Sequence, residues 1–488
     1  MKETHERYIL SIDQGTTSCR AIIFDTTGKP RGIGQREFTQ FFPKPGWVEH
    51  DATEILREQI ACIKDAIKNA NITADRIACV GITNQRETTV VWNKKTGEPI
   101  YHAIVWQCRR TADIALALKA DTEWFRKKTG LMPDAYFSGP KIAWILDNVE
   151  GARELAAKGE LAFGTIDSWL IWNLTEDKFH LTEPSNASRT MLFNIQSLQW
   201  DEELLAKLNV PANMMPTVVS SNANFGNTNN ALLGFSAPVL AVMGDQQAAL
   251  FGQGCLEPGM AKCTYGTGSF LLANIGTELI LTPGMLTTVA WKWENQLATY
   301  ALEGAIFVSG AAIQWLRDGL NIIESSEETE AIARSVDSSD GVCFVPAFVG
   351  LGSPWWNPDV RGTITGITRG TKRCHIVRAA LEAIAFQVTD VVKDMADNGQ
   401  PLTQLKIDGG ATRNQFLVDF QADLLGLPIL RSSQPEATAW GVAALAGITF
   451  GIIKSVGSNN DVTMPQNNRE EEYRGWQQSL KAAIVAAE

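Results

Sequence analysis

The sequence predicts an α/β protein built from two similar domains with a ligand-binding cleft between them. Its 488 residues suit two large domains of about 100 to 250 residues each. Strand-like and helix-like segments alternate, and the order seen in the first half begins again near residue 254. We expect residues 1–253 and 254–488 to be the domains, because glycines and a proline interrupt the pattern at FGQGCLEPG. No linker separates them, so they should pack together, and ligands commonly bind between packed domains.

The first half opens as an antiparallel meander. The strand-like runs YILSID, CRAIIFD and RGIGQREF are joined by the tight turns QGTTS and TTGKP. Residues 52–70 carry apolar side chains at helical spacing, and the short strand IACVGIT follows. Mixed strands and crossover helices indicate an α/β domain.

The second half repeats this layout. Residues 259–276 read as a strand, a Gly/Thr turn and a strand, followed by the strand-like run LTTVAWKW. The pattern then predicts helices over 305–320 and 373–398.

Composition excludes several classes of function. The 43 basic against 54 acidic residues give a net charge of −11 and a pI near 5.2, unlike a general nucleic-acid or membrane-surface binder. No apolar stretch approaches the roughly 18 to 20 residues that span a bilayer, so we expect no stable membrane insertion. The eight cysteines form no CxxC pair and no metal-ligand pattern, which predicts reduced thiols. The charged segment 1–7 leads straight into a strand, so we expect no signal peptide and a cytoplasmic location.

Phosphate binding, if present, must use turns other than a P-loop, because GxxxxGK[ST] is absent. In the turn from Asp13 to Ser18 a carboxylate ends a strand, and a glycine and three hydroxyl residues, Thr16, Thr17 and Ser18, follow. Such a turn can offer N–H and O–H donors to phosphate oxygens. Arg20 could offset phosphate charge, and Asp13 could hold Mg²⁺ directly or through water. The alternative is an ordinary β-turn.

A second turn of the same kind, Tyr265 to Ser269, occupies the corresponding place in the second half. Two such hairpins at the starts of two similar domains would face each other across a cleft and bind one phosphate chain from both sides. A third segment, LKIDGGATRNQFLVDFQADLLG, predicts a strand, a turn at Gly409-Gly410 and a helix starting near Asn414. Its glycines would let an adenosine approach the backbone. For both segments a plain structural connection is the alternative.

Nine segments along nearly the whole chain resemble the glycerol kinases of the sugar and polyol kinase family, which shares the fold of the actin and Hsp70 ATPases. NQRETT, VWQCRRTA and GDQQAALFGQ are the most specific. The segments are SIDQGTTSCRAIIFD, PKPGWVEHD, GITNQRETTVVWN, AIVWQCRRTA, NASRTMLFNI, GDQQAALFGQ, YGTGSF, YALEGAIFVSGAAIQWLRD and IDGGATRNQF.

The resemblance implies two RNase-H-like domains flanking a central catalytic cleft, and the ATP- and Mg²⁺-dependent phosphorylation of glycerol to sn-glycerol 3-phosphate. It implies a polyol pocket formed by Arg86, Glu87, Trp106, Tyr136, Asp245, Gln246 and Phe270. It implies nucleotide contacts from Thr16, Thr17, Ser18, Arg20, Thr267, Gly310, Gln314, Gly410 and Asn414. Homodimers or larger homo-oligomers are expected, with no nucleic-acid partner.

Asp245 suits the role of general base. It follows the apolar strand APVLAVMG, where it could accept a hydroxyl proton during phosphoryl transfer, and it is a second candidate for binding Mg²⁺. An Asp between a strand and a helix is alternatively a plain N-cap. The neighbouring Gln246 and Gln247 and the resemblance favour the base.

Arg86 and Glu87 offer the donors and acceptors that vicinal hydroxyls require, with Gln246 adding both kinds. Adjacent side chains of a regular strand point to opposite faces, so both can reach one ligand only where the strand ends or bulges. We therefore predict irregular backbone at Arg86. A solvent-facing ion pair is the alternative.

Trp106, Tyr136 and Phe270 would form an apolar wall along the carbon chain of the polyol, although core packing is the commoner fate of such residues. Because water competes as a nucleophile, we expect the cleft to close on its ligands around a hinge near residues 252–259.

The chain departs from its relatives in places. From Phe225 to Asp245 it has no Lys, Arg or His, so we expect regulation neither by a sugar bisphosphate nor by histidine phosphorylation. Smaller departures are Trp355-Trp356-Asn357 and Gln415. The alternative functions are a kinase of another small polyol or ketose, such as dihydroxyacetone or xylulose, and a non-catalytic protein that uses ATP to switch partners.

Overall fold

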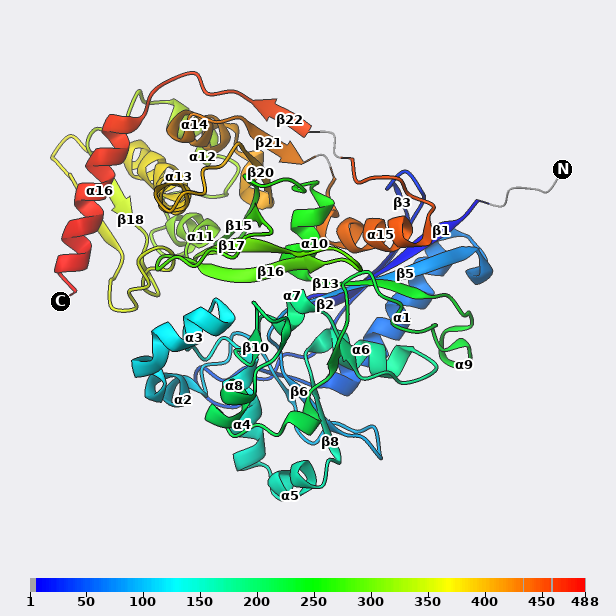
Figure 1. The fold of residues 1–488 in the computed structure, drawn as a ribbon. Helices are drawn as coiled ribbons and strands as arrows, with labels where there is room; N and C mark the ends of the chain where they lie inside the picture. Colours follow the sequence, from blue (N-terminus) through cyan, green and yellow to red (C-terminus); the bar gives the residue numbers. More distant parts are fainter. Residues whose placement is uncertain (1–5, 433, 458–459, 488) are drawn as a thin grey trace.

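The computed structural model describes residues 6–432, 434–457 and 460–487, so the predicted outer domain limits at residues 1 and 488, and most of the segment 1–7, lie outside the described residues. Two β-sheets organise the chain (Figure 1). In the first, the order is β13-β5-β1-β2-β3; β1, β2 and β3 are antiparallel, while β5 and β13 run parallel to β1. Its strands are β1 (Tyr8–Gln14), β2 (Ser18–Phe24), β3 (Pro30–Glu37), β5 (Ile77–Asn84) and β13 (Val239–Gly244).

The second sheet contains the strand order of the first, as the sequence predicts, but the sequence did not predict β17; the strand-like run LTTVAWKW forms β16, at the edge of the sheet. Its order is β16-β17-β15-β14-β20-β21-β22. Strands β14, β15 and β17 are neighbouring and antiparallel, and β20 and β21 run parallel to β14, so these five strands match the five of the first sheet, while β16 and β22 are added at the two edges. The strands are β14 (Met260–Tyr265), β15 (Ser269–Gly276), β16 (Leu286–Lys292), β17 (Ala298–Ile306), β20 (Gln404–Asp408), β21 (Ile429–Ser432) and β22 (Asn460–Thr463).

One long helix follows each meander, as predicted. Helix α1 (Ala52–Ala70) begins where the Asp51 carboxylate accepts the N–H of Thr53, and ends at Asn71, which adopts a left-handed conformation. Helix α13 (Arg373–Asp397) takes the equivalent place in the second half. The helix predicted over 305–320 is wrong in its first turn, because β17 continues to Ile306 and α11 (Gly310–Asp318) begins only at Gly310. The segment AIFV is rich in β-branched and aromatic residues, which suit the strand.

Two helices, one from each half, lie near the centre of the molecule (Figure 1). Helix α10 (Asp245–Gly252) follows β13, and α15 (Ala437–Phe450) follows β21. Both contribute to an apolar core that also includes residues of both sheets. They cross with their backbones in contact: a Cβ added at Gly441 would lie 1.9 Å from the carbonyl oxygen of Ala248, and one added at Gly252 would lie 2.0 Å from that of Ala437. Only glycine fits at either position.

The long connection between β5 and β13 forms a further lobe with its own apolar core (Figure 1). The lobe has no counterpart in the second half, where β20 and β21 are joined by little more than one helix. The helices of the connection are α2 (Ala112–Ala117), α3 (Thr122–Thr129), α4 (Ser138–Asn148), α5 (Ala152–Ala157), α6 (Ile166–Leu174), α7 (Pro184–Ala187), α8 (Glu202–Lys207) and α9 (Asn230–Leu233). Of these, α6 and α9 pack into the core of the first sheet instead of the lobe core.

Short strands and a few further helices complete the described residues. In the first half these strands are β4 (Glu49–His50), β6 (Val90–Asn93), β7 (Ala103–Ile104), β8 (Leu161–Gly164), β9 (Leu181–Thr182), β10 (Phe193–Asn194), β11 (Gln199–Trp200) and β12 (Thr217–Val218). In the second half the elements are β18 (Cys343–Val345), β19 (Thr363–Thr365), α12 (Thr329–Arg334), α14 (Gln415–Leu425) and α16 (Glu470–Val485). The eight cysteines are free thiols, as predicted. Among the described helices none combines the length and the apolar run that crossing a bilayer needs.

Candidate active site

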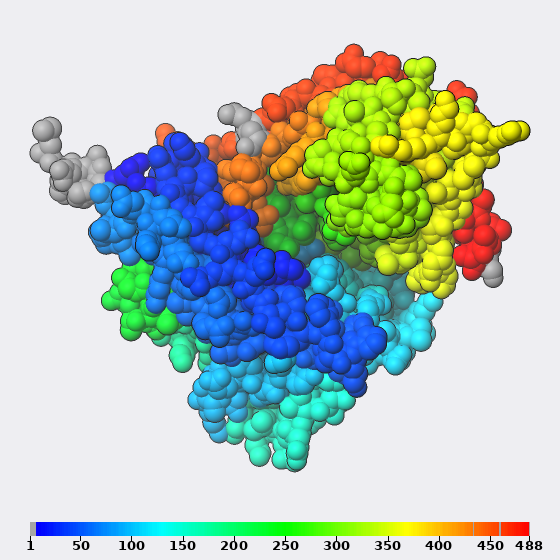
Figure 2. All heavy atoms as spheres, turned by 180° about the vertical axis from the view of Figure 1, so that it is seen from behind, coloured from blue at the N-terminus to red at the C-terminus, as the bar shows by residue number. Residues whose placement is uncertain are grey.

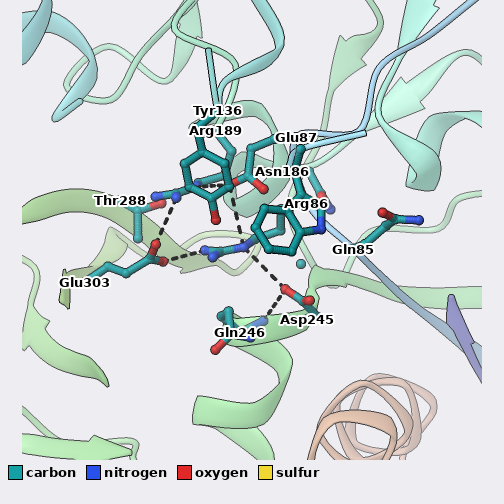
Figure 3. Close-up of polar contacts among 12 residues, drawn as sticks. Gln85, Arg86, Glu87, Tyr136, Asn186, Arg189, Asp245, Gln246, Thr288 and Glu303 are labelled. Atoms are coloured by element: carbon teal, nitrogen blue, oxygen red, sulfur yellow. Dashed lines mark hydrogen bonds and ion pairs between the residues drawn. The ribbon is translucent and has the colours of Figure 1, made fainter. Parts of the chain in front are cut away.

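Four charged side chains from both halves of the chain form a buried ion network (Figure 3). The Nη1 of Arg86 donates to Oε2 of Glu303 at 2.6 Å, and the Nη2 of Arg189 donates to the other oxygen of that carboxylate at 2.9 Å. The Nε of Arg189 also donates to Glu87 at 2.6 Å. None of the four side chains is more than 3% exposed. Two guanidinium groups thus balance two carboxylates, as burial of charge requires.

The backbone at Arg86 is irregular, as predicted. Strand β5 ends at Asn84, the N–H of Thr88 donates to the carbonyl oxygen of Arg86 at 2.7 Å, and Glu87 has a φ of 60°. This turn brings two adjacent side chains into the same network, with Nε of Arg86 3.9 Å from Oε1 of Glu87. The alternative of a solvent-facing ion pair is wrong, because both side chains are buried.

Asp245 lies at the edge of this network as the first residue of α10. Its Oδ1 is 3.3 Å from Nε of Arg86 and accepts the N–H of Gln246 at 2.7 Å. The side chain remains 32% exposed, unlike its neighbours. Enclosure by the protein raises the pKa of Asp245 above its ordinary value, while Arg86 opposes the shift. The N-cap of the helix is Gly244, so the alternative role of Asp245 as N-cap does not apply.

The short helix α7 fixes the ends of the two strands that carry these residues. The Oγ of Ser185 accepts the N–H of Gly244, the last residue of β13, at 2.9 Å. The same hydroxyl donates to the buried carboxylate of Glu183. Asn186 exchanges side-chain hydrogen bonds of 3.0 and 3.2 Å with Asn84, the last residue of β5. The start of α10 and the turn after β5 are therefore tied to one support.

Two of the three predicted wall residues lie together. The rings of Trp106 and Tyr136 meet edge to face, with centroids 5.6 Å apart. The guanidinium of Arg189 lies over the Tyr136 ring at 5.5 Å, so this wall borders the ion network. The Nε1 of Trp106 donates to Oγ1 of Thr16 at 2.9 Å, which joins the wall to the first phosphate turn.

Phe270, the third predicted wall residue, comes from the second half. It pairs with Ala305 across β15 and β17, two pairs along from Leu272 and Glu303. Residues paired across antiparallel strands share a sheet face with residues two positions along. Phe270 therefore lies on the same face as Glu303, and it is half-buried.

The first predicted phosphate turn is a tight hairpin in which the N–H of Gly15 donates to the carbonyl oxygen of Ser18 at 3.0 Å. Thr17 is exposed at its tip, and the Ser18 hydroxyl accepts a weak bond of 3.4 Å from Gln35. The Arg20 guanidinium donates to Glu436, directly before α15, at 2.6 Å. Arg20 thus pairs with a carboxylate of the second half in this structure.

The second predicted turn contacts the start of α11. The N–H of Gly310 donates to the carbonyl oxygen of Gly266 at 2.9 Å, and that of Ala311 donates to Thr267 at 3.0 Å. A Cβ at position 310 would lie 2.6 Å from the Gly266 oxygen, so only glycine allows this approach. Thr267 and Gln314 are both exposed here.

The third predicted segment packs behind this turn. Gly409 has a φ of 96°, and a Cβ there would lie 2.3 Å from the carbonyl oxygen of Tyr265. Gly410 faces open space. Asn414 caps α14 by accepting the N–H of Leu417 at 3.1 Å, and its amide donates to Thr329 at 3.0 Å. Figure 2 shows the molecule hollowed between the dark-blue N-terminal strands and the yellow-green segment after α11.

The carboxylates predicted to bind Mg²⁺ suit a cation. Asp13 is the second-last residue of β1, its burial raises its pKa to about 7, Arg20 opposes this shift and Asp245 adds to it. Bound Mg²⁺ would relieve this unfavourable burial of negative charge. Among the described residues no three His, Cys, Asp or Glu side chains form a complete metal-ligand group. Mg²⁺ would therefore take one or two carboxylates, with water and phosphate oxygens completing its shell.

The sequence reasoning missed two members of the ion network, Arg189 and Glu303. Both lie in segments that carry the resemblance, NASRTMLFNI and YALEGAIFVSG, but neither was given a role. A signal was available: each is a lone charge beside an apolar run, and a charge inside a buried element needs a partner of opposite sign.

Residues 8–252 and 261–450 match the N-terminal and C-terminal domains of the FGGY family of carbohydrate kinases. The chain is 54% identical to a glycerol kinase of Carboxydothermus hydrogenoformans, with 98% of each chain covered, and 53% identical to one of Desulforamulus reducens, with 97% of each covered. Its fold matches that of a Plasmodium falciparum glycerol kinase with ADP at a TM-score of 0.94 and 36% identity over 98% of each chain.

Proposed function

The chain belongs to the FGGY family of carbohydrate kinases and, within it, to the glycerol kinases, and from this premise we propose that it transfers the γ-phosphoryl group of ATP to a terminal hydroxyl of glycerol. The products are sn-glycerol 3-phosphate and ADP. One observation carries the proposal: the partly exposed Asp245 carboxylate, directly after the first sheet, lies 3.3 Å from the buried Arg86 guanidinium, which itself bonds to Glu303 of the second sheet.

In the proposed reaction Asp245 accepts the proton of the attacking hydroxyl. A raised pKa suits a general base, because the carboxylate then has a useful affinity for the proton it receives. Phosphoryl transfer has a loose transition state, so the protein contributes mainly by aligning the alcohol with the γ-phosphate and by offsetting charge. The support of β13 by Ser185 provides the rigidity that such alignment requires.

In the proposed site, glycerol is bound by both hydrogen-bond donors and hydrogen-bond acceptors. Arg86 donates to hydroxyl oxygens, Glu87 accepts hydroxyl protons, and Gln246 contacts a hydroxyl beside the base. Glu303 and Arg189 position Arg86 and Glu87 through the ion network. The rings of Trp106, Tyr136 and Phe270 pack against the carbon chain and exclude water.

The nucleotide is proposed to lie between the two hairpins. Thr16, Thr17, Ser18 and Thr267 contact the phosphates, and Gly310, Gln314, Gly410 and Asn414 line the side that receives the rest of the nucleotide. Arg20 contacts a phosphate only by exchanging its partner Glu436 for a phosphate oxygen. Asp13 and Asp245 are the proposed Mg²⁺ ligands; the ion, when bound, offsets the negative charge of the phosphates.

A substrate series tests this function. With Mg-ATP, ADP release should depend on glycerol, and kcat/KM should fall about 10-fold or more for dihydroxyacetone, because its carbonyl cannot donate to a carboxylate such as Glu87. Xylulose and gluconate, which carry more bulk, should be poorer still. The measurement is a coupled ADP-release assay across the four compounds. Turnover that is fastest with a ketose would replace glycerol as the substrate, and ADP release indifferent to all four would favour the ATP-switch alternative.

Domain closure is a second prediction that follows from the function. We propose residues 1–253 and 254–488 as the two bodies, with a hinge near residues 252–259, where Gly254 and Gly259 both have positive φ. Small-angle scattering should show a smaller radius of gyration with glycerol plus a non-hydrolysable ATP analogue than with either alone. Identical profiles in all three states would contradict closure. The cytoplasmic location, the homo-oligomeric state and the absence of sugar-bisphosphate and phospho-histidine regulation also stay predictions.

A further inference from the structure

A buried lysine on the second sheet contacts the proposed glycerol site without having a role in the reaction described above. Strand β14 directs Ala261, Cys263 and Tyr265 into the core of the second half. The intervening Lys262 faces the other way, toward α10, and is fully buried. Burying an ammonium group is costly unless it is paired, so its presence calls for a physical reason.

The hydrogen-bond partners of Lys262 are uncharged. Its Nζ donates to Oε1 of Gln246, on α10, and to Oγ1 of Thr264 at 3.1 Å. Burial lowers the pKa of Lys262, while the carboxylates of Asp408 on β20 and Asp245 on α10 support its charge. Arg86, after β5, opposes that charge. The lysine thus links the second sheet to the residue next to the proposed base.

The bond between Lys262 and Gln246 removes an ambiguity in the site. A glutamine amide can present either its oxygen or its amino group to a ligand, since a half-turn exchanges the two. An ammonium has three donors and no acceptor. Only the amide oxygen can therefore face Lys262, and the amino group of Gln246 is turned away from it.

We propose that Lys262 is a positioning residue for the polyol: by binding the amide oxygen of Gln246, it makes that side chain present its amino group, a donor, to a substrate hydroxyl. This inference rests on the proposed function, in which Gln246 contacts glycerol. It separates the tasks at the site: Asp245 accepts a proton from one hydroxyl, while Gln246 donates to a neighbouring hydroxyl oxygen. An oxygen that carries no proton, such as a carbonyl oxygen, could therefore still bind beside Gln246, because it only needs to accept a hydrogen bond there.

The test uses full-length protein and two variants that remove the same donor differently. Lys262→Met removes the ammonium that orients the amide. Gln246→Glu keeps an oxygen for Lys262 but presents a second oxygen to the polyol in place of the amino group. Each should raise the KM for glycerol about 10-fold and leave the KM for ATP unchanged. Because both changes remove one interaction, the double variant should be no worse than either single one. Lys262→Arg, which keeps donors for the amide oxygen, should restore most of the affinity for glycerol.

Lys406 supplies a matched control. It lies opposite Lys262 in the register of β14 and β20, is also buried, and donates to the carbonyl oxygens of Gln253 and Gly254. Lys406→Met should lower thermal stability; because its partners lie in the proposed hinge, any effect on closure should change the KM for glycerol and the KM for ATP alike, whereas Lys262→Met should raise the KM for glycerol alone.

The outcomes distinguish a failure of the role proposed for Lys262 from a failure of the proposed function. If Gln246→Glu raises the KM for glycerol but Lys262→Met does not, the role of Lys262 is wrong and the proposed function stands. If Lys262→Met fails to fold, Gln246→Glu decides alone, because an unchanged KM for glycerol in that variant overturns the inference. A wild-type protein without glycerol-dependent ADP release would refute the proposed function and this inference together.

Discussion

Replacing Asp245 with asparagine is expected to lower kcat with glycerol by about 10²- to 10⁴-fold. The amide has nearly the size of the carboxylate, so its oxygen can take the place of the carboxylate oxygen that lies 3.3 Å from Nε of Arg86. It cannot take up the proton of the attacking hydroxyl. The coupled ADP-release assay measures the loss, and calorimetric titration with ADP should show nucleotide affinity close to that of the wild type.

Asp51→Asn is the matched control. Asp51 also precedes a helix, and its carboxylate accepts the backbone N–H of Thr53 at 2.8 Å, which is the N-capping role first considered for Asp245. Asparagine caps helices as well as aspartate does, so kcat should not change. Equal activity of the two variants would show that Asp245 is not the base.

Replacing Glu303 with glutamine should lower the free energy of unfolding by about 3 to 5 kcal/mol, because it leaves two buried guanidinium groups without their shared carboxylate. Arg86 and Arg189 donate to separate oxygens of Glu303, and the side chain is only 2% exposed. Arg86 would also lose the partner that fixes it beside Glu87, so the KM for glycerol should rise. Urea unfolding and the ADP-release assay measure the two effects.

This effect should depend on pH. Flanking by two guanidinium groups overcomes the opposing effect of burial and lowers the pKa of Glu303 to about 2, against an ordinary value of 4.5. A lowered carboxyl pKa stabilises the fold above the ordinary value, and this stabilisation is lost as pH falls from about 4.5 toward 2. The stability difference between wild type and Glu303→Gln should therefore be constant from pH 6 to 8 and shrink in acid.

Glu382→Gln provides the comparison for Glu303. Glu382 is also buried, but it pairs with the single arginine Arg378, one helical turn away on α13. Its replacement should cost stability without raising the KM for glycerol. If Glu303→Gln is no less stable than wild type and binds glycerol equally well, the ion network has no part in the site.

The sequence predicted the elements better than it predicted the contacts between them. The repeat of strands and the helix over 52–70 were accessible because each is a local pattern of apolar side chains. The irregular backbone at Arg86 followed from the geometry of a strand, which cannot direct two neighbours to one side. Both conclusions required only residues close in the chain.

Contacts that join distant segments could not be predicted in this way. The pairing of Arg20 with Glu436 joins residues 416 positions apart, and nothing in either local segment identifies its partner. The hydrogen bond from Trp106 to Thr16 likewise joins residues that are far apart in the sequence. The nucleotide contact of Asn414 stays a prediction; the structure shows that its side chain caps α14, which a helix start at this position would have suggested.

The close crossing of α10 and α15 means that a change at the crossing point would tilt α10 and move Asp245 at its N-terminus. Gly252 and Gly441 meet with no side chain between them. A side chain added at this contact could not be accommodated by a change of rotamer and would have to displace the helix backbone. Asp245 is at the other end of the same helix, about 10 Å away at 1.5 Å per residue. A swing of about 10° would carry its carboxylate about 2 Å, and a misplacement of about 1 Å can already cost a hundredfold in rate. A methyl group introduced at Gly252 or Gly441 would thus lower the catalytic rate although neither residue belongs to the proposed glycerol site.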